Sequence, residues 1–258
     1  MANHESDLRR DVIRVCRFMY ENKLVAATDG NVSVKLADGL LLFTPSGVSK
    51  ALVTEEQLIV TDMAGRKVRG VQEPSSEIRM HLAVYEERDD VRAVVHAHPP
   101  VATAFTVAGV SLAPCVLPEV VFHLGTIPTS AYATPASPQG PGVVRELVRK
   151  CDAILLDRHG TLTVGDDVFK AYFKLEKLEN YAQVMLIARQ LGTVRTLPKD
   201  EVDRLMQTRR QLGITGRVTM CMGCDICDQR KDEQTAKTQR VQRTRRRSGP
   251  SSADSTSG

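Results

Sequence analysis

The chain of 258 residues contains no tryptophan, and aromatic residues make up only 4% of it. It also contains no apolar run of the roughly 18 residues that a membrane-spanning helix needs. The first residues, Met1 to Asp7, are polar and lack the apolar core of a secretory signal. These absences argue against a helical membrane protein and against a secreted one. We therefore expect a soluble, cytoplasmic protein with no membrane partner.

The cysteines do not form the paired framework typical of small secreted proteins, although the chain has six of them. Three are scattered along the chain. The others, Cys221, Cys224 and Cys227, are spaced by two residues, which resembles part of an iron–sulfur or zinc site. A fourth local cysteine is missing. We expect either a second metal, with a ligand from Asp225, Asp228, another subunit or solvent, or a reduced cluster without metal.

Positive charge is concentrated at the C-terminal end. The chain carries a net charge of +4, but residues 229–258 hold eight Lys or Arg and three Asp or Glu, so the rest is nearly neutral. This end has few apolar residues to bury and no aromatic residue to stack on bases, which argues against specific nucleic-acid binding. We expect one folded domain over residues 1–215, a cysteine-rich extension over 216–230 and a basic disordered tail over 231–258.

Hydrophobic periodicity predicts a domain in which hairpins come first and strands then alternate with helices. Apolar residues at helical spacing predict helices at residues 5–21, 75–88, 100–108, 140–151, 167–191 and 199–212. Short apolar or alternating runs predict strands at 32–36, 40–44, 57–61, 92–96, 153–156 and 161–164, with further short strands within 109–139. This order indicates an α/β or α+β domain with a mixed sheet.

Two histidines stand at the end of a buried strand. Residues 92–95 are mostly apolar and β-branched, and His96 and His98 follow them. Side chains at i and i+2 leave the same face of a strand, so both imidazoles point the same way, as two ligands of one divalent metal ion would. The next residues, Pro99-Pro100, end the strand. Alone, this pattern also fits two solvated or core histidines.

A third histidine follows a second buried strand. Residues 153–156 are apolar, and His159-Gly160 come after them, where glycine permits a tight turn. Three histidines with one open coordination position are typical of a catalytic zinc ion rather than a structural one. We interpret His4 as a solvated terminal residue and His81 as a surface or packing residue of a helix.

Three polar loops before the histidine pair combine small residues with backbone N–H and hydroxyl donors. They are Gly30-Asn31-Val32-Ser33, Thr44-Pro45-Ser46-Gly47 and Pro74-Ser75-Ser76-Glu77. Such loops can wrap a phosphate without a cationic side chain. A serine at the N-cap of the helix expected after Pro74 adds the positive end of the helix dipole. Singly, each such loop is more often only a turn or a helix cap. Together with three metal-type histidines, the three loops predict a phosphorylated substrate beside a metal ion.

Together with Ala131-Tyr132-Ala133-Thr134, these motifs resemble the class II aldolase/adducin family, and within it the L-fuculose-1-phosphate aldolase branch. Their order and spacing match the family from about residue 5 to residue 192. The resemblance implies a three-layer α/β/α domain with a central mixed, largely antiparallel sheet. It also implies a cyclic homotetramer with active sites between neighbouring subunits.

Residue by residue, the resemblance implies a zinc site beside a phosphate cradle. His96, His98 and His159 correspond to ligands of one Zn2+ per subunit. Glu77 corresponds to the carboxylate that also binds the zinc at rest and acts as general base when substrate displaces it. The residues that correspond to the phosphate cradle are Gly30, Asn31, Ser46, Gly47, Ser75 and Ser76. The predicted reaction is cleavage of a ketose 1-phosphate, such as L-fuculose 1-phosphate, to dihydroxyacetone phosphate and an aldehyde.

The proton donor departs from the family pattern. The fuculose aldolases place a tyrosine near the position of Leu117 and a second one in a C-terminal segment, whereas no tyrosine follows Tyr181 here. Glu119 is a candidate replacement with a catalytic role, and His123 is a weaker one. The alternative for Glu119 is a solvated loop acid.

Two other activities of the family, and one role without catalysis, remain as alternatives. Glu119 lies near the catalytic glutamate of methylthioribulose-1-phosphate dehydratases, so a dehydratase-like lyase is the main alternative. A pentulose-phosphate 4-epimerase is less expected, because those enzymes have aspartate in place of Glu77. An adducin-type interaction module is less expected still, because such domains lose the metal histidines.

Overall fold

The computed structural model describes residues 4–219. The cluster of Cys221, Cys224 and Cys227 and the basic tail lie outside the described residues. Within the described part, no helix combines the length and the apolar composition that crossing a bilayer would require.

One seven-stranded sheet forms the centre of the fold, in the strand order β4-β3-β2-β1-β5-β7-β6. Its strands are β1 (Asn31–Lys35), β2 (Leu41–Phe43), β3 (Ile59–Thr61), β4 (Lys67–Arg69), β5 (Ala93–Ala97), β6 (Ala153–Leu156) and β7 (Gly160–Gly165). Every neighbouring pair runs antiparallel. Within residues 4–219, the parallel component of the expected mixed sheet is limited to one isolated bridge, between Thr129 and Leu155.

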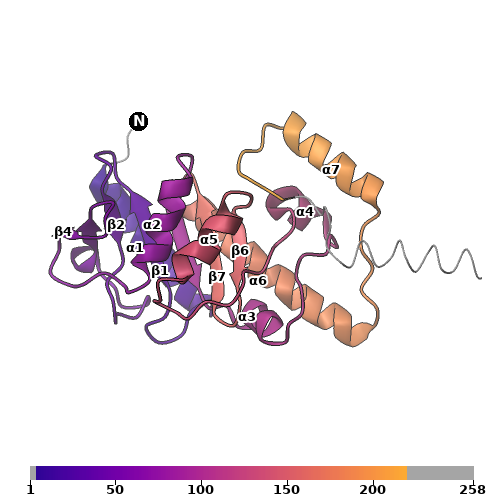
Figure 1. The fold of residues 1–258 in the computed structure, drawn as a ribbon, viewed down its shortest axis with the longest axis horizontal. Helices are drawn as coiled ribbons and strands as arrows, with labels where there is room; N and C mark the ends of the chain where they lie inside the picture. Colours follow the sequence, from indigo (N-terminus) through magenta and orange to yellow (C-terminus); the bar gives the residue numbers. More distant parts are fainter. Residues whose placement is uncertain (1–3, 220–258) are drawn as a thin grey trace, which may run out of the picture. The chain divides into compact units, whose positions relative to one another are not determined.

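Helices cover both faces of this sheet and confirm the three-layer α/β/α fold (Figure 1). They are α1 (Glu5–Glu21), α2 (Ile78–Glu87), α3 (Pro100–Val107), α4 (Pro118–Leu124), α5 (Gly140–Val148), α6 (Val168–Leu191) and α7 (Lys199–Gln211). Apolar residues of α1 and α6 pack on one face of the sheet, and those of α2 and α5 pack on the other. A third cluster joins α3, α4 and α6 beside β6.

Strand alternation separates apolar from polar residues along β1. Val32 and Val34 point into the core beneath α1 and α6. Asn31 and Ser33 therefore face α2, and both are buried, with side chains 2% and 0% exposed. The same alternation in β5 puts Val95 in the α1/α6 core and turns His96 to the α2 side. The polar residues of the candidate site thus share one face of the sheet.

The structure differs from the prediction at the start of one helix and in the segment over 109–139. Helix α2 begins at Ile78 with Glu77 at its N-cap position, so neither Ser75 nor Ser76 caps it. These serines form the preceding turn, where the Ser75 hydroxyl accepts a hydrogen bond from the Glu77 N–H at 3.3 Å. Between residues 109 and 139 the structure has α4 in place of regular strands, because Pro118 starts a helix and apolar residues follow at helical spacing.

Two short elements at the sheet edge were not anticipated. Strand β4 is exposed at all its positions, and its Lys and Arg side chains suit an edge strand that must resist further pairing. The expected strand over 57–61 begins only at Ile59, because Glu55–Gln57 form a 3-10 turn.

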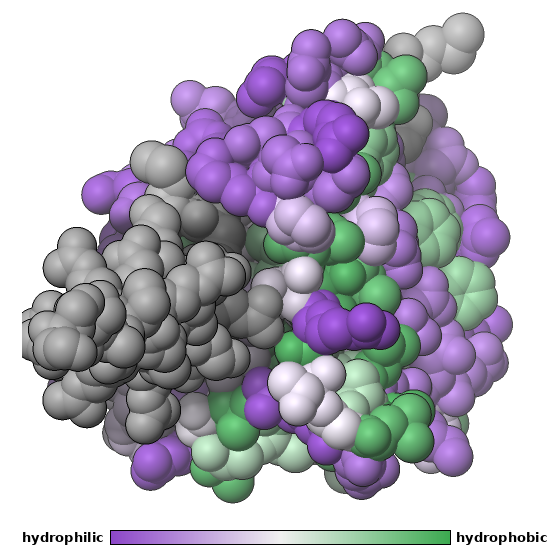
Figure 2. Space-filling model, turned by 90° about the vertical axis from the view of Figure 1, so that its right-hand side faces the viewer, coloured by the Kyte–Doolittle hydropathy of each residue, from purple (hydrophilic) through white to green (hydrophobic). Residues whose placement is uncertain are grey.

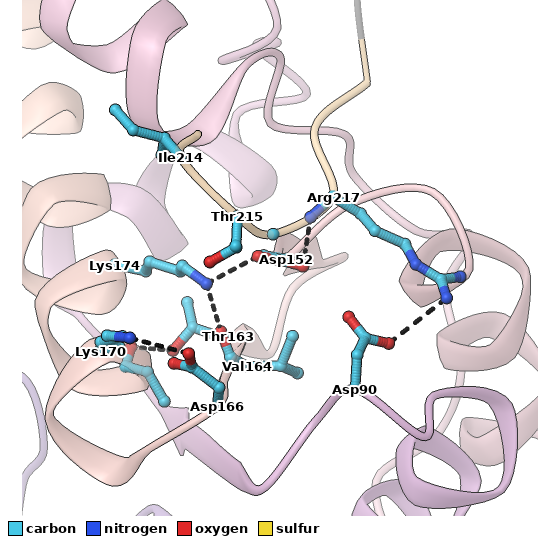
Figure 3. Close-up of polar contacts among 12 residues, drawn as sticks. Asp90, Asp152, Thr163, Val164, Asp166, Lys170, Lys174, Ile214, Thr215 and Arg217 are labelled. Atoms are coloured by element: carbon cyan, nitrogen blue, oxygen red, sulfur yellow. Dashed lines mark hydrogen bonds and ion pairs between the residues drawn. The ribbon is translucent and has the colours of Figure 1, made fainter. Parts of the chain in front are cut away.

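A cavity of about 650 Å³ lies where β6 begins and β7 ends, at the opposite end of these strands from His159. The buried carboxylate of Asp152 organises it. This carboxylate accepts hydrogen bonds from Arg88 at 2.8 Å, from Lys174 at 2.7 Å and from the Arg217 backbone N–H at 3.1 Å. Figure 3 shows the last two arriving from α6 and from the segment after α7. Asp152 therefore attaches residues 216–219, which the sequence assigned to the extension, to the body of the domain.

Replacing Asp152 by alanine should lower the free energy of unfolding by about 3–5 kcal/mol, because it removes the carboxylate that pairs with Lys174 and one of the two that pair with the buried Arg88. Chemical denaturation measures this change. Asp200→Ala provides the control, because that carboxylate is 72% exposed and pairs with Arg204 only on the surface of α7. The control should lose no more than about 0.5 kcal/mol. Equal losses in both variants would show that Asp152 has no special structural role.

Candidate active site

Four side chains from different elements converge at one end of the central strands. Glu77 precedes α2, His96 lies in β5, His98 follows β5, and His159 lies in the turn between β6 and β7. Each offers one ligand atom, and these atoms all lie within 4.8 Å of one another. The Glu77 carboxylate is 2.9 Å from His159 Nε2 and 3.2 Å from His96 Nε2, and the Nε2 atoms of His96 and His98 are 3.0 Å apart.

The groups behind two of the imidazole rings determine which ring nitrogen faces the cluster. His96 Nδ1 lies 2.7 Å from the Thr161 carbonyl oxygen, which can only accept, so Nδ1 carries the proton and Nε2 keeps its lone pair. His98 Nδ1 lies 3.4 Å from the carboxylate of Asp29. A carbonyl or carboxylate behind a histidine is the usual device that orients a metal ligand. Both rings therefore present Nε2 to the centre of the cluster.

The charges of the cluster suit a divalent cation. Burial raises the pKa of the Glu77 carboxyl, but the charges of and hydrogen bonds from His96 and His159 outweigh it and hold that pKa well below its usual range. Burial, together with His96 and His159, lowers the pKa of His98 to about 4. Nitrogen lone pairs and a carboxylate oxygen at such short distances repel one another unless a proton or a metal cation lies between them. Three imidazoles and a carboxylate are also a donor set that Zn2+ prefers.

Two glycines allow the backbone to approach the cluster closely. A Cβ atom at Gly30, where φ is +74°, would lie 2.7 Å from the Val25 side chain and 2.8 Å from the His96 carbonyl oxygen. A Cβ atom at Gly160 would collide with the Ala97 carbonyl oxygen and lie 2.7 Å from His98 Cδ2. Any larger residue at either position would displace a histidine of the cluster.

The structure places the three predicted phosphate loops side by side, next to the cluster. Pro45 and Pro74 form a β-bridge, and the Ser46 N–H donates to the Glu73 carbonyl oxygen at 2.9 Å. The Asn31 amide donates to Ser75 Oγ at 3.3 Å and to the Glu77 carboxylate at 2.8 Å. The loops that carry Gly30, Asn31, Ser46, Gly47, Ser75 and Ser76 thus lie close to a common point beside Glu77.

A narrow crevice opens beside the cluster. Ser76, Glu77 and His159 line it together with residues Ala133 to Ser137. The Ala131–Thr134 motif therefore belongs to the same site as the histidines, although it is about 25 residues away from His159 in the sequence.

Lys50 and His81 are site residues that the sequence analysis missed. Lys50 is only 1% exposed, and its ammonium group donates to the carbonyl oxygens of Thr28 and Val48 at 3.0 and 2.9 Å. These bonds join the residues just before the Gly30 loop to the residue just after Gly47. Burial lowers its pKa. His81 is fully buried, with Nε2 2.6 Å from Asn31 Oδ1, so it is not the surface residue that was one of its two interpretations. Its position four residues after Glu77 was the available signal.

The structure does not bring the expected proton donors to this cluster. Glu119 lies exposed in the first turn of α4 and does not line the crevice beside Glu77. His123, in the last turn of α4, lines the cavity near Asp152 at the opposite end of the strands. Burial and the charges of Lys177 and Arg209 lower its pKa.

The chain matches known proteins over the part that builds this site. The family model of the class II aldolase and adducin N-terminal domain matches residues 10–186. An L-fuculose phosphate aldolase of Methanococcus maripaludis is 36% identical over 184 residues, which are 70% of this chain and 97% of that protein. A 3-oxo-tetronate 4-phosphate decarboxylase of Cupriavidus necator is 30% identical and covers 70% of this chain and 85% of its own length.

Solved structures agree with this match. The crystal structure of L-fuculose-1-phosphate aldolase from Thermus thermophilus superposes with a TM-score of 0.65 at 33% identity, covering 74% of this chain and all of that one. Helix α7 and the segment up to Thr219 lie beyond the residues that the family model matches. The fold, the histidine–carboxylate cluster and the extent of the match together place this chain in the class II aldolase and adducin family.

Proposed function

We propose that this chain is a zinc-dependent aldolase that cleaves a ketose 1-phosphate to dihydroxyacetone phosphate and an aldehyde. The observation that carries this proposal is the convergence of the Glu77 carboxylate and three histidine Nε2 atoms beside the predicted phosphate loops. The similarity to an L-fuculose phosphate aldolase over 97% of its length supports the same class of substrate.

In this proposal His96, His98, His159 and Glu77 hold the metal. A bound zinc ion would supply Lewis-acid stabilisation of the negative charge that develops on the ketose oxygens as the carbon–carbon bond breaks. The reaction takes a proton from the hydroxyl of the carbon that becomes the aldehyde and adds a proton to the carbon left behind. We assign the second proton transfer to Glu77, which lies ionised beside the cluster. In the condensation direction its carboxylate would take a proton from the carbon of dihydroxyacetone phosphate that forms the new bond, and in cleavage the protonated carboxyl would return that proton to the same carbon.

The substrate phosphate would lie among the three loops. Asn31 and the hydroxyls of Ser75 and Ser76 supply side-chain donors. The Ser46–Gly47 segment supplies the Ser46 hydroxyl and the Gly47 N–H, because the Ser46 N–H already donates to the Glu73 carbonyl oxygen. Gly30 keeps the Asn31 loop close to β5. Lys50, buried between two of the loops, holds their separation and adds positive charge beneath them.

We assign the remaining proton transfer to a group from a neighbouring subunit of a homotetramer. Glu119 does not line the crevice of its own chain, so it can act only at the site of another chain. Exposed apolar side chains near the end of α6 and after α7 support such an assembly: Ile187, Leu191 and Leu212 are 54%, 85% and 65% exposed. Figure 2 shows hydrophobic residues between the hydrophilic ones on this side of the molecule.

The presence of Glu77 in the cluster favours aldol cleavage over dehydration. The dehydratases of this family lack a carboxylate that corresponds to Glu77. A panel of ketose 1-phosphates, incubated with and without a chelator, should yield dihydroxyacetone phosphate in a chelator-sensitive manner. Formation of a dehydrated diketone phosphate, or loss of CO2 from an oxo acid phosphate, without dihydroxyacetone phosphate would overturn the proposal.

Replacing Glu77 by glutamine should reduce kcat by about 10²- to 10⁴-fold, the usual contribution of a positioned general base. Zinc content and melting temperature should change little, because all three imidazole ligands remain and glutamine keeps an oxygen atom at the position of the carboxylate. Glu73→Gln is the matched control: its side chain is 75% exposed and pairs with Lys67, away from the cluster. Near-normal turnover in Glu77→Gln would exclude the proposed role.

Purified protein should contain about one zinc ion per chain at the cluster, measured by elemental analysis. His159→Asn should lower this content severalfold, because it removes one ligand. His123→Asn, a change of the same kind on α4, should leave it unaltered. Because Cys221, Cys224 and Cys227 are potential ligands of a second metal, the measurement should be repeated with these three residues replaced by serine. Zinc retained undiminished in His159→Asn would contradict the assignment.

A further inference from the structure

A continuous row of buried polar groups runs from the core to Glu77. It consists of Tyr85, Ser33, His81, Asn31 and Glu77, joined by contacts of 2.8, 2.7, 2.6 and 2.8 Å. Three members, Glu77, His81 and Tyr85, are spaced by four residues at the start of α2 and along it, so they share one face of the helix. The other two alternate along β1 and face α2. We refer to these five residues as the polar row.

The direction of every hydrogen bond in the row follows from Glu77. An ionised carboxylate only accepts, so the Asn31 atom that faces it is the NH2 group, and Asn31 Oδ1 faces His81. His81 Nε2 must then carry a proton. Because His81 is fully buried without an acidic partner in contact with it, it is neutral, and its Nδ1 has no proton and accepts from the Ser33 hydroxyl. Ser33 has then used its single proton, so Tyr85 donates to Ser33.

This direction has a consequence for Asn31. An amide can rotate by 180° and exchange its oxygen with its nitrogen, and only the surrounding partners decide which one faces the substrate. The His81 Nε2–H would meet the Asn31 NH2 group in the flipped state, and the Asn31 oxygen would meet the Glu77 carboxylate. Both pairs are unfavourable, so the row allows one orientation.

We propose that His81 is a positioning residue that fixes the Asn31 amide with its NH2 group toward Glu77 and the phosphate loops. Ser33 and Tyr85 act behind it, because they hold His81 in the tautomer with the proton on Nε2. The consequence for activity rests on the proposed function, since it assigns Asn31 to phosphate binding and Glu77 to proton transfer. The tautomer and the amide orientation do not depend on it.

The first test separates the geometry from the activity. In protein labelled with 15N at histidine, the long-range 1H–15N spectrum identifies the tautomer of each neutral imidazole, and His81→Phe identifies the His81 signals. We expect the Nε2–H form for His81 in the wild type. An Nδ1–H form, or a doubly protonated ring at neutral pH, would overturn the proposal even if the enzyme is an aldolase. Should His81→Phe fail to fold, His81→Gln serves for the assignment.

The second test uses His81→Phe and His81→Gln, with inorganic phosphate as a probe. Phenylalanine fills the space without a donor, whereas the glutamine amide can still donate to Asn31. In His81→Phe we expect about 10- to 100-fold weaker phosphate binding and a similar loss of kcat/KM. This is the size of effect typical of residues that orient a ligand-binding side chain through a hydrogen bond. His81→Gln should recover most of this loss. Equal defects in both variants, or wild-type phosphate binding in His81→Phe, would overturn the proposal.

The row beyond His81 supplies the controls. Ser33→Ala and Tyr85→Phe should each shift part of the His81 population to the other tautomer and weaken phosphate binding less than His81→Phe does. Tyr172→Phe removes the hydroxyl of a buried tyrosine that contacts Asn22 and Glu176. Tyr172 belongs to the core on the α1 and α6 face of the sheet, whereas the row faces α2, so this change should leave phosphate binding unaltered. If phosphate binds as expected but no ketose 1-phosphate is cleaved, the proposed reaction fails and the role of His81 stands.

Discussion

Three imidazole nitrogens and one ionised carboxylate face one another at about hydrogen-bonding distance. These groups repel one another unless a proton or a metal cation lies between them. The fold supplies what holds it together. The Thr161 carbonyl and the Asp29 carboxylate orient two of the rings from behind, and neighbouring antiparallel strands carry His96 and the turn of His159. Burial of apolar residues on both faces of the sheet offsets the cost of keeping these groups together.

The same strands serve stability and chemistry, because successive residues point to opposite faces. In β1 and β5 one set of residues completes the core under α1 and α6, while the other set carries Asn31, Ser33 and His96. Helix α2 follows the same division along its length. Its apolar residues join the core with α5, and its polar face continues from Glu77 to Tyr85. A slip of one residue in the β1–β5 register would therefore destroy the core and the site together.

Site residues that follow a local sequence pattern could be predicted, whereas those whose role depends on contacts with distant residues could not. His96, His98 and His159 could be found because each follows a short apolar strand, and the family resemblance added Glu77 and the phosphate loops. No local pattern shows that Lys50 reaches Thr28, or that Ser33 reaches His81 across 48 residues, because charged and polar side chains are usually exposed. The start of α2 was misplaced because serines before an apolar run also suit a turn that packs against another loop.

Gly30 and Gly160 carry no reactive group, yet each lies where a single added methyl group would press on a histidine of the cluster. Such positions have as little freedom to vary as the ligands themselves. A mutational scan of this enzyme that scores only lost activity would therefore identify these glycines together with the residues that take part in the reaction. Reading metal content beside activity would separate the residues that react from those that only leave room.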